Sequence, residues 1–171
     1  MKSITSCALP EGALLLRYAG AQGYADCYRT EVPGPVSLAQ YVEAFYTSPL
    51  FRLERGILKL AVARPSSDAQ ARQLGEGRID AFAAWTVEAR APGQLLLCDY
   101  QGRTRSWLMV LPLPERTGTR LYFGSAVVPT PRSVQRGRPA MGWLFRALLG
   151  FHRLYSRLLL GAARAGLSGR A

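Results

Sequence analysis

Three polar side chains are the first candidates for chemistry in this sequence: His152, Tyr100 and Arg105. His152 is the single histidine of the chain. Because an imidazole titrates near neutral pH, it could act as a general acid or base or donate a hydrogen bond to a ligand. An arginine beside a tyrosine hydroxyl could hold the carboxylate or phenolate of an otherwise apolar molecule. These residues would support acid–base work of the cyclase or dehydratase type, without a metal.

These candidates also have purely structural interpretations. A histidine at the edge of an apolar helix face is commonly a hydrogen-bonded boundary residue. Arg105 is close enough to an expected turn to extend its guanidinium into water. The remaining polar candidates are Tyr24, Asp26, Tyr28 and Asp99, and Asp26 could simply pair with an arginine.

The sequence contains none of the motifs that usually identify a reaction. GxSxG, GxxxxGK[ST], HExxH and a GxGxxG after a strand are all missing, so hydrolase, nucleotide-binding and zinc-protease functions lose their usual support. Cys7, Cys27 and Cys98 show no CxxC spacing, and with one histidine to join them we expect no metal site, no cofactor and no disulfide framework. Apolar neighbours should raise the pKa of Cys98, which argues against a nucleophile there.

The composition predicts one globular domain. The 171 residues are 49% apolar and 19% charged, which excludes disorder, collagen and coiled coil. We expect a single domain over residues 1–171 with a core over roughly 13–165. The N-terminal apolar run is interrupted at Arg17, which argues against a signal peptide and favours the cytoplasm. Charged residues also break the apolar stretch Met141–Ala163, so we expect no membrane span.

The charge is strongly positive and unevenly placed. There are 22 Lys+Arg against 11 Asp+Glu, a net charge of +11, and no acidic residue follows Glu115. Such a block could contact nucleic acid, anionic lipid or an acidic partner. Only Lys2 and Lys59 are lysines, so nearly all of the basic residues are arginines. A general compositional preference for arginine, with the charged side chains lying on solvated faces, explains the positive charge equally well.

The N-terminal half is expected to supply one strand and a set of short helices. Turn residues bound a β-prone segment, and two capping signals precede apolar residues at helical spacing. The predicted elements are a strand over Tyr24–Val32 with Ala13–Tyr18 as a candidate extension, and helices over Ser37–Tyr46, from Ser48 to before Pro65, and from Ser66 or Ser67 through Leu74.

From Ile79 onward the apolar period changes to two, which predicts antiparallel strands. The four runs are Asp80–Arg90, Gln94–Gln101, Thr104–Leu111 and Thr119–Val128, so five or six strands are expected in all. Ala91-Pro92-Gly93-Gln94 predicts a type II turn and Gly102-Arg103 a tight turn.

Two-residue turns would divide these strands into two faces. Trp85 would then lie opposite Tyr100, and Cys98 opposite Trp107, so that one face carries Trp85, Val87, Leu96, Cys98, Trp107 and Met109. The other face would be polar except for an apolar patch that needs a cover. A helix or a second copy of the chain, making a homodimer, could cover it; the patch is Leu95, Leu97, Leu108 and Val110.

The last predicted element is a long amphipathic helix from Ala140 to about Arg164. Its broad apolar side, which would suit packing along a sheet, carries Leu144, Leu148, Phe151, Tyr155, Leu158 and Ala162. The opposite stripe could make weak contact with an anionic membrane and consists of Arg146, Arg153, Arg157 and Arg164. Aromatic residues other than Trp143 do not interleave with it, which argues against sequence-specific nucleic-acid binding.

Two segments carry a resemblance to a known superfamily. Tyr24-Ala25-Asp26-Cys27-Tyr28-Arg29 followed by a helical pair, and Phe151-His152-Arg153-Leu154-Tyr155-Ser156-Arg157 in the closing helix, resemble bacterial proteins of unknown function in the START and Bet v 1-like (SRPBCC, polyketide cyclase-like) superfamily. The resemblance covers roughly Tyr24 to Arg164. It implies an α+β helix-grip fold, in which an antiparallel sheet wraps around the long C-terminal helix and a short helical pair follows the first strand.

The resemblance also implies an apolar cavity between sheet and helix that binds a lipid or polyketide-like molecule. The expected ligand-binding residues are Trp85, Leu96, Tyr100, Arg105, Trp107, Met109, Phe123, His152 and Tyr155, with Leu121 in the same wall. Aromatic residues on a patterned sheet face are equally explained as core. A peripheral membrane or partner-binding module acting through the arginine stripe is the alternative function, and a metal-free cyclase or dehydratase is the second.

Overall fold

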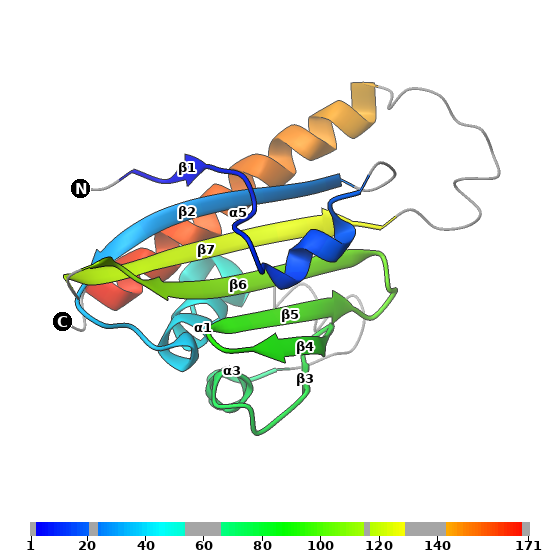
Figure 1. The fold of residues 1–171 in the computed structure, drawn as a ribbon. Coiled ribbons are helices and arrows are strands. Elements are labelled where there is room, and N and C mark those ends of the chain that lie inside the picture. The colour runs from blue at the N-terminus through cyan, green and yellow to red at the C-terminus, as the bar shows by residue number, and fades with distance from the viewer. Residues whose placement is uncertain (1–2, 21–23, 54–65, 115–116, 129–142, 169–171) are drawn as a thin grey trace.

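Seven antiparallel strands form a single sheet in the order β1-β2-β7-β6-β5-β4-β3 (Figure 1). The computed structural model describes residues 3–20, 24–53, 66–114, 117–128 and 143–168, the side chains of 143–153 and 168 excepted. The strands are β1 (Thr5–Ser6), β2 (Tyr24–Pro33), β3 (Ala81–Phe82), β4 (Trp85–Ala91), β5 (Gln94–Asp99), β6 (Thr104–Pro112) and β7 (Gly118–Val127). The helices among these residues include η1 (Leu14–Tyr18), α1 (Leu38–Tyr46), α3 (Asp68–Gly75) and α5 (Trp143–Ser168).

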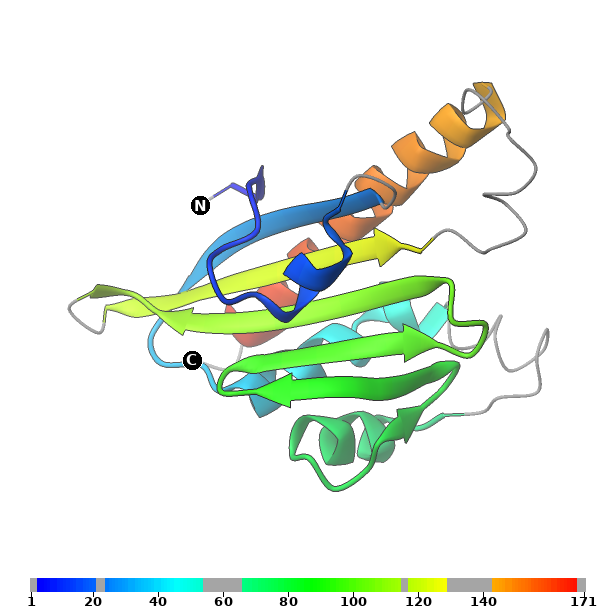
Figure 2. The same ribbon diagram turned by 45° about the vertical axis from the view of Figure 1, so that its right-hand side comes forward.

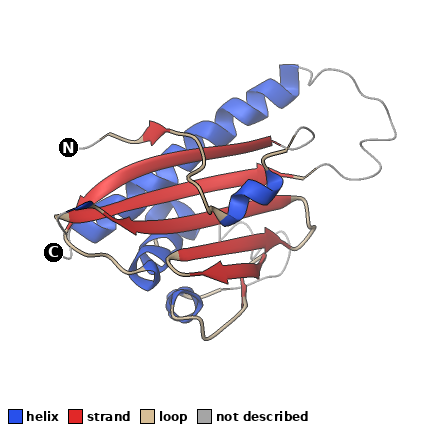
Figure 3. Ribbon diagram, viewed as in Figure 1, coloured by secondary structure: helices blue, strands red, loops and turns tan. Residues whose placement is uncertain are grey.

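Helices cover the two faces of the sheet unequally. In Figures 1 and 2, α1 and α5 lie behind the sheet, and the short η1 lies alone in front of it. Figure 3 shows the same separation of helices and strands. We call the face covered by α1 and α5 the inner face, and the face covered by η1 the outer face. The fold class is therefore α+β. Among the described helices, none combines the length and hydropathy needed to cross a membrane.

The capping box predicted at Ser37 is confirmed, and Ser67 is the one of the two predicted starts that begins the helix ending at Gly75. Ser37 Oγ accepts a hydrogen bond from the backbone N–H of Gln40, whose side chain accepts from the backbone N–H of Ser37. Ser67 and Gln70 make the same reciprocal pair at the start of α3. These bonds satisfy N–H groups that have no partner within the helix, so local sequence alone sets both helix starts.

Two predicted strand segments are wrong. Leu14–Tyr18 is a 3-10 helix rather than an extension of β2, because Gly12 at φ +74° turns the chain across the outer face. The predicted strand Asp80–Arg90 is split into β3 and β4, because Ala83 has a positive φ of 51°. Helical residues continue from Pro49 to Leu53, and the rest of the predicted second helix lies outside the described residues.

The predicted strand register is also wrong, although the turn at Gly93 has the positive φ that type II requires. Cys98 lies opposite Arg105 rather than Trp107, and Trp85 lies opposite Asp99 rather than Tyr100. Four residues, not two, connect β5 to β6. The Asp99 carboxylate shapes this turn by accepting the backbone N–H groups of Arg103 and Thr104 at 2.7 and 3.0 Å.

The β5–β6 pairing is shifted by two residues, so Leu96, Trp107 and Met109 stay together as predicted, but the elements that cover the two faces differ from the prediction. Leu95, Leu97 and Leu108 are fully buried on the inner face beneath α1 and the other helices, so this chain itself covers the patch for which a homodimer was one expectation. Leu96, Trp107 and Met109 lie instead on the outer face against η1. A bulge between Val87 and Ala89 leaves Trp85 and Val87 on the inner face. The predicted cavity wall is therefore divided between the two faces.

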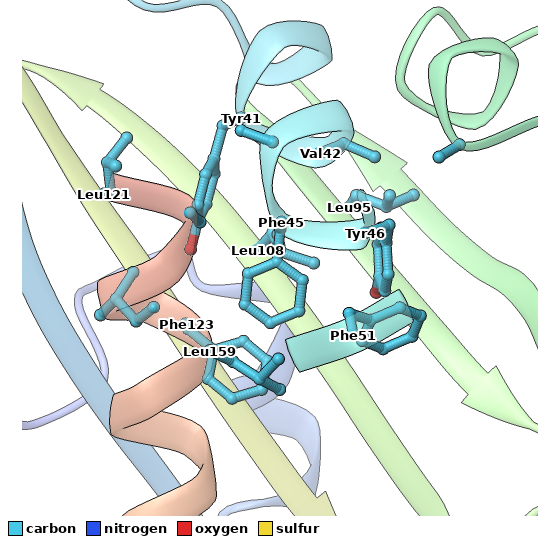
Figure 4. Close-up of a cluster of buried hydrophobic side chains, with 14 of the residues drawn as sticks. Tyr41, Val42, Phe45, Tyr46, Phe51, Leu95, Leu108, Leu121, Phe123 and Leu159 are labelled. Atoms are coloured by element: carbon cyan, nitrogen blue, oxygen red, sulfur yellow. The ribbon is translucent and has the colours of Figure 1, made fainter. Parts of the chain in front are cut away.

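Aromatic side chains fill the space between α1 and the inner face (Figure 4). The Phe45 ring lies 4.8 Å from that of Phe123, and the Tyr46 ring lies 4.7 Å from that of Phe51. The Tyr41 hydroxyl donates to the backbone carbonyl of Tyr122 at 3.1 Å. This part of the interior is packed core, as the structural interpretation of the aromatic residues expected.

The buried side of α5 differs from the predicted one. Ser156, Leu159, Leu160, Ala163 and Leu167 are buried against β2, β7 and α1, whereas Leu158, expected inside, is 52% exposed. Only a narrow stripe is covered because α5 crosses near the β2 edge of the sheet (Figure 1).

Two of the four arginines in the predicted stripe contact β2. Arg157 stacks over the Tyr28 ring at 5.5 Å, and Arg164 donates to Thr30 Oγ1 at 3.4 Å. The side chains of Arg146 and Arg153 lie outside the described residues. The guanidiniums of Arg157 and Arg164 thus contribute to holding α5 against β2 as well as to surface charge.

Gly124 tests how tightly η1 is packed on the outer face. A Cβ at this position would lie 2.8 Å from Leu15 Cδ2, 2.9 Å from the Asp26 carbonyl oxygen and 3.0 Å from the Trp107 ring. We expect Gly124→Ala to lower the free energy of unfolding by about 1–3 kcal/mol. A Cβ at Gly166 on α5 would have no atom within 4 Å. Gly166→Ala should therefore raise the free energy of unfolding by about 0.5–1 kcal/mol. Urea denaturation of both variants checks this, and a stabilising Gly124→Ala would contradict the packing described.

Candidate functional site

An open pocket of about 870 Å³ lies along the β2 edge of the sheet. The N-terminal segment forms one wall, β2 another, and η1 and α5 complete it. The lining residues are Ser6, Cys7, Ala8, Leu9, Leu16, Ala19, Tyr24, Ala25, Asp26, Cys27, Tyr28, Leu154 and Arg157. Its volume lies in the range typical of small-molecule sites, about 300–1,000 Å³.

The Asp26 carboxylate organises the polar part of this pocket. Its Oδ2 accepts the hydroxyls of Tyr24 and Tyr28 at 3.2 and 3.4 Å. Its Oδ1 accepts the hydroxyl and the backbone N–H of Ser125 at 2.6 and 3.2 Å. Alternation along β2 puts Tyr24, Asp26 and Tyr28 on one face, and the register puts Ser125 directly opposite Asp26. These four donors hold the carboxylate and both phenol rings in place.

Arg157 supplies a positive charge beside this network. Its guanidinium carbon lies 5.5 Å from the centre of the Tyr28 ring, and its side chain is exposed. It makes no ion pair with any carboxylate in the part of the chain that the structure describes. Leu154, one turn earlier on α5, is 56% exposed and lines the same pocket. The site therefore combines a cation with an apolar helix surface.

A row of hydroxyl groups continues from Asp26 across the inner face. Register pairs Asp26 with Ser125 and Ser125 with Ser106, and Ser106 Oγ lies 3.3 Å from the Tyr46 hydroxyl. Ser156, on the buried side of α5 next to Arg157, has a fully buried hydroxyl that forms no hydrogen bond with any residue the structure describes. The Ser156 hydroxyl therefore gives the sheet–helix interface one hydrogen-bonding group that no described residue satisfies.

Arg105 is placed away from this pocket, on the outer face. Its Nε donates to Glu88 Oε2 at 2.5 Å, and its guanidinium stacks 4.7 Å from the centre of the Tyr18 ring. The Tyr18 hydroxyl donates to the other Glu88 oxygen at 2.5 Å. Burial, reinforced by the hydrogen bond to Glu88 and opposed by Arg105, raises the pKa of Tyr18. The carboxylate that Arg105 binds is therefore one of the protein's own, and the cluster fastens η1 to the sheet.

The other predicted site residues do not gather in one place. Tyr100 is 45% exposed in the turn after β5, where the Gln101 side-chain amide donates to its hydroxyl at 2.8 Å. Trp107 is fully buried on the outer face, and its indole N–H donates to Gln94 at 2.9 Å. Trp85, Phe123 and Tyr155 belong to the inner core. The side chain of His152 lies outside the described residues.

The cysteines show which groups the sequence analysis missed. Cys7 and Cys27 line the pocket with their sulfur atoms 3.4 Å apart. Burial strongly raises the pKa of Cys27, with Cys7 adding to the effect. Burial also raises the pKa of Cys98, as its apolar neighbours predicted. Among the described residues, no cluster of His, Cys, Asp and Glu could hold a metal ion. The polar alternation Tyr24-Asp26-Tyr28 was the one sequence signal for this site.

Comparison with known proteins adds little to this geometry. No protein-family model matches the chain, and no curated protein sequence is detectably similar to it. The solution NMR structure of the C-terminal domain of protein DR_A0006 from Deinococcus radiodurans aligns over 75% of this chain and 90% of that domain, at 16% identity and a TM-score of 0.27. Overlap at this TM-score does not establish a shared fold.

Glu88 provides a test of the outer-face cluster. Glu88→Gln removes the charge that neutralises Arg105, whose side chain is only 11% exposed. We expect the free energy of unfolding to fall by about 1–2 kcal/mol, the cost of a poorly solvated unpaired group. Asp80→Asn is the matched control, because Asp80 is 81% exposed and its pair with Arg90 spans 3.5 Å, so a change below about 0.5 kcal/mol is expected. Equal losses in chemical denaturation would show that the Glu88 cluster has no special role.

Proposed function

We propose that this chain is a small-molecule-binding domain that holds an amphipathic, mainly apolar ligand between the β2 edge of the sheet and the C-terminal helix. The observation that carries the proposal is the pocket of about 870 Å³ in which the Asp26 network and Arg157 adjoin apolar side chains. Apolar walls with a few convergent polar groups are the usual composition of ligand sites.

The lining suggests how such a ligand would lie. Its apolar body would contact Leu9, Leu16 and Leu154, which come from three separate segments of the chain. Its polar end would reach Arg157, whose guanidinium suits a carboxylate or a phenolate. Arg157 thus takes the role that the sequence analysis gave to Arg105. The aromatic core beneath α1 is already filled, so the proposed site lies at the sheet edge.

The proposal assigns ligand binding to this site and does not assign it a reaction. Asp26 accepts four hydrogen bonds from the protein, an arrangement that suits a carboxylate used to position hydroxyl groups. A metal-free cyclase or dehydratase would need an acid or base facing the ligand, and His152 remains the candidate for it.

The same proposal includes a helix-grip fold of the START and Bet v 1-like superfamily, acting in the cytoplasm. The strand order supports this, because the chain crosses the sheet consecutively from β3 through β4, β5 and β6 to β7, and β7 then pairs with β2. The burial of α5 residues against β2 and β7 supports it as well.

The test compares two leucines on α5 that differ in one respect. Leu154 and Leu158 are 56% and 52% exposed, but only Leu154 lines the pocket. The probe is 8-anilinonaphthalene-1-sulfonate, an aromatic anion. We expect one probe per chain, with Leu154→Gln and Arg157→Gln each weakening affinity about five- to tenfold, the loss of one apolar or charged contact. Leu158→Gln should bind as the wild type does. Fluorescence titration measures this, and equal affinities in all four proteins would contradict the site.

A second candidate function, contact with a membrane surface, is favoured by one observation. Leu154 and Leu158 are exposed one turn apart on α5, with the exposed Arg157 between them, in a chain of net charge +11. An apolar strip flanked by arginine is the composition of interfacial helices.

Vesicle sedimentation separates the two functions. If the helix binds membranes, vesicles rich in phosphatidylglycerol should retain the wild-type chain at low salt and release it as salt rises, because screening weakens the attraction. Leu158→Gln and Leu154→Gln should then weaken retention equally. Vesicle retention that changes neither with salt nor on the substitution Leu158→Gln would contradict this candidate function.

A further inference from the structure

Two thiols face each other where the N-terminal segment lies along β2. The β1–β2 register pairs Thr5 with Arg29 and Ser6 with Tyr28, and its continuation places Cys7 opposite Cys27. The backbone N–H of Cys7 donates to the Cys27 carbonyl at 3.0 Å, so the pairing extends through this position. The Cys7 thiol donates to the Cys27 sulfur at 3.4 Å.

This geometry is close to that of a disulfide. Residues directly opposite each other in an antiparallel pair have Cα atoms about 4.5–5.5 Å apart, within the roughly 4.4–6.8 Å that a disulfide spans. The sulfurs, 3.4 Å apart, need to approach by about 1.4 Å to reach the length of a disulfide bond. The third cysteine, Cys98, lies opposite Arg105 on the outer face and makes its hydrogen bond to the Asp99 carbonyl.

We propose that Cys7 and Cys27 form a redox-active dithiol, which a small-molecule disulfide such as oxidised glutathione converts to an intramolecular disulfide. The Cys7 thiolate attacks one glutathione sulfur, forms a mixed disulfide and releases one glutathione thiolate. The Cys27 thiol then loses its proton and attacks the Cys7 sulfur, which releases the second glutathione thiolate. The two protein thiols lose two electrons and two protons, and oxidised glutathione becomes two reduced glutathione molecules.

Burial assigns the order of these two steps. Cys7 is partly exposed and lines the pocket, whereas Cys27 is 2% exposed. The oxidant therefore reaches Cys7, and Cys27 needs only to reach its neighbour. Burial raises the pKa of Cys27, so the second step should accelerate as the pH rises.

Oxidation would change how firmly one wall of the pocket is held. The strands β1 and β2 pair over two residues each, and a single backbone hydrogen bond at Cys7 continues the contact. A covalent bond one residue beyond it would fix the segment that carries Cys7, Ala8 and Leu9 against β2. The proposal needs no ligand in the pocket, so it stands or falls independently of the proposed function.

The experiment incubates the 171-residue chain in glutathione buffers of increasing oxidation, quenches with N-ethylmaleimide and counts labels by intact mass spectrometry. The reduced chain should take three labels, one for each cysteine, and the oxidised chain one, on Cys98. Proteolysis should recover Cys7 and Cys27 in one linked pair of peptides. The melting temperature should rise by roughly 5–10 °C on oxidation.

Matched variants make the outcome decisive. Cys98→Ser should form the disulfide as the wild type does, whereas Cys7→Ser should show neither loss of labels nor the rise in melting temperature. Three labels under every buffer, a stable glutathione adduct on Cys7 that Cys27 never displaces, or a crosslink that includes Cys98 would each overturn the proposal.

Discussion

The structure depends on one constraint, which is that the central strands are apolar on both faces and must be covered on both. Leu95, Leu97 and Leu108 need a cover on the inner face, and Leu96 and Trp107 need one on the outer face. The amphipathic helices α1 and α5 cover the inner face. The outer face is covered by the short η1, which the turn at Gly12 directs across the sheet and which Leu15 and the Glu88 cluster hold in place. The helices pack on both faces because this packing removes apolar surface area from water.

The pocket is a consequence of this two-sided covering. The N-terminal segment reaches η1 by running along β2, so it meets the sheet edge that α5 crosses on the other side (Figure 1). Between these two covers the β2 edge is only partly filled. There the alternation of β2 presents Asp26 with its tyrosines toward α5, and Cys27 toward the N-terminal segment. A single strand thus supplies the polar network to one cover and a thiol to the other.

Several of the arginines that make this chain positive contact other groups of the protein itself. Arg105 is neutralised by Glu88, and Arg120 makes two hydrogen bonds to Glu31 across β2 and β7. Arg164 contacts Thr30, while Arg157 stacks on Tyr28 and still faces the pocket. Several guanidiniums therefore join elements of the fold, which arginine does well because its planar group stacks and bonds at once. The chain has a net charge of +11. The location of each arginine in the fold decides whether its charge is available to a partner.

Local chemistry determined much of the fold from the sequence alone. Capping boxes at Ser37 and Ser67, the turn at Gly93 and the strand periodicity after Ile79 depend on neighbouring residues, and each was predictable. Leu96, Trp107 and Met109 were correctly placed together, apart from Leu95 and Leu97, because alternation along a strand is local. Which set faces the helices was decided by tertiary structure, and the bulge beside Ala89 moved Trp85 and Val87 from their predicted set to the other face. Tertiary structure also decided the pocket and the approach of Cys7 to Cys27. Both features join segments whose contact depends on how the whole sheet is covered.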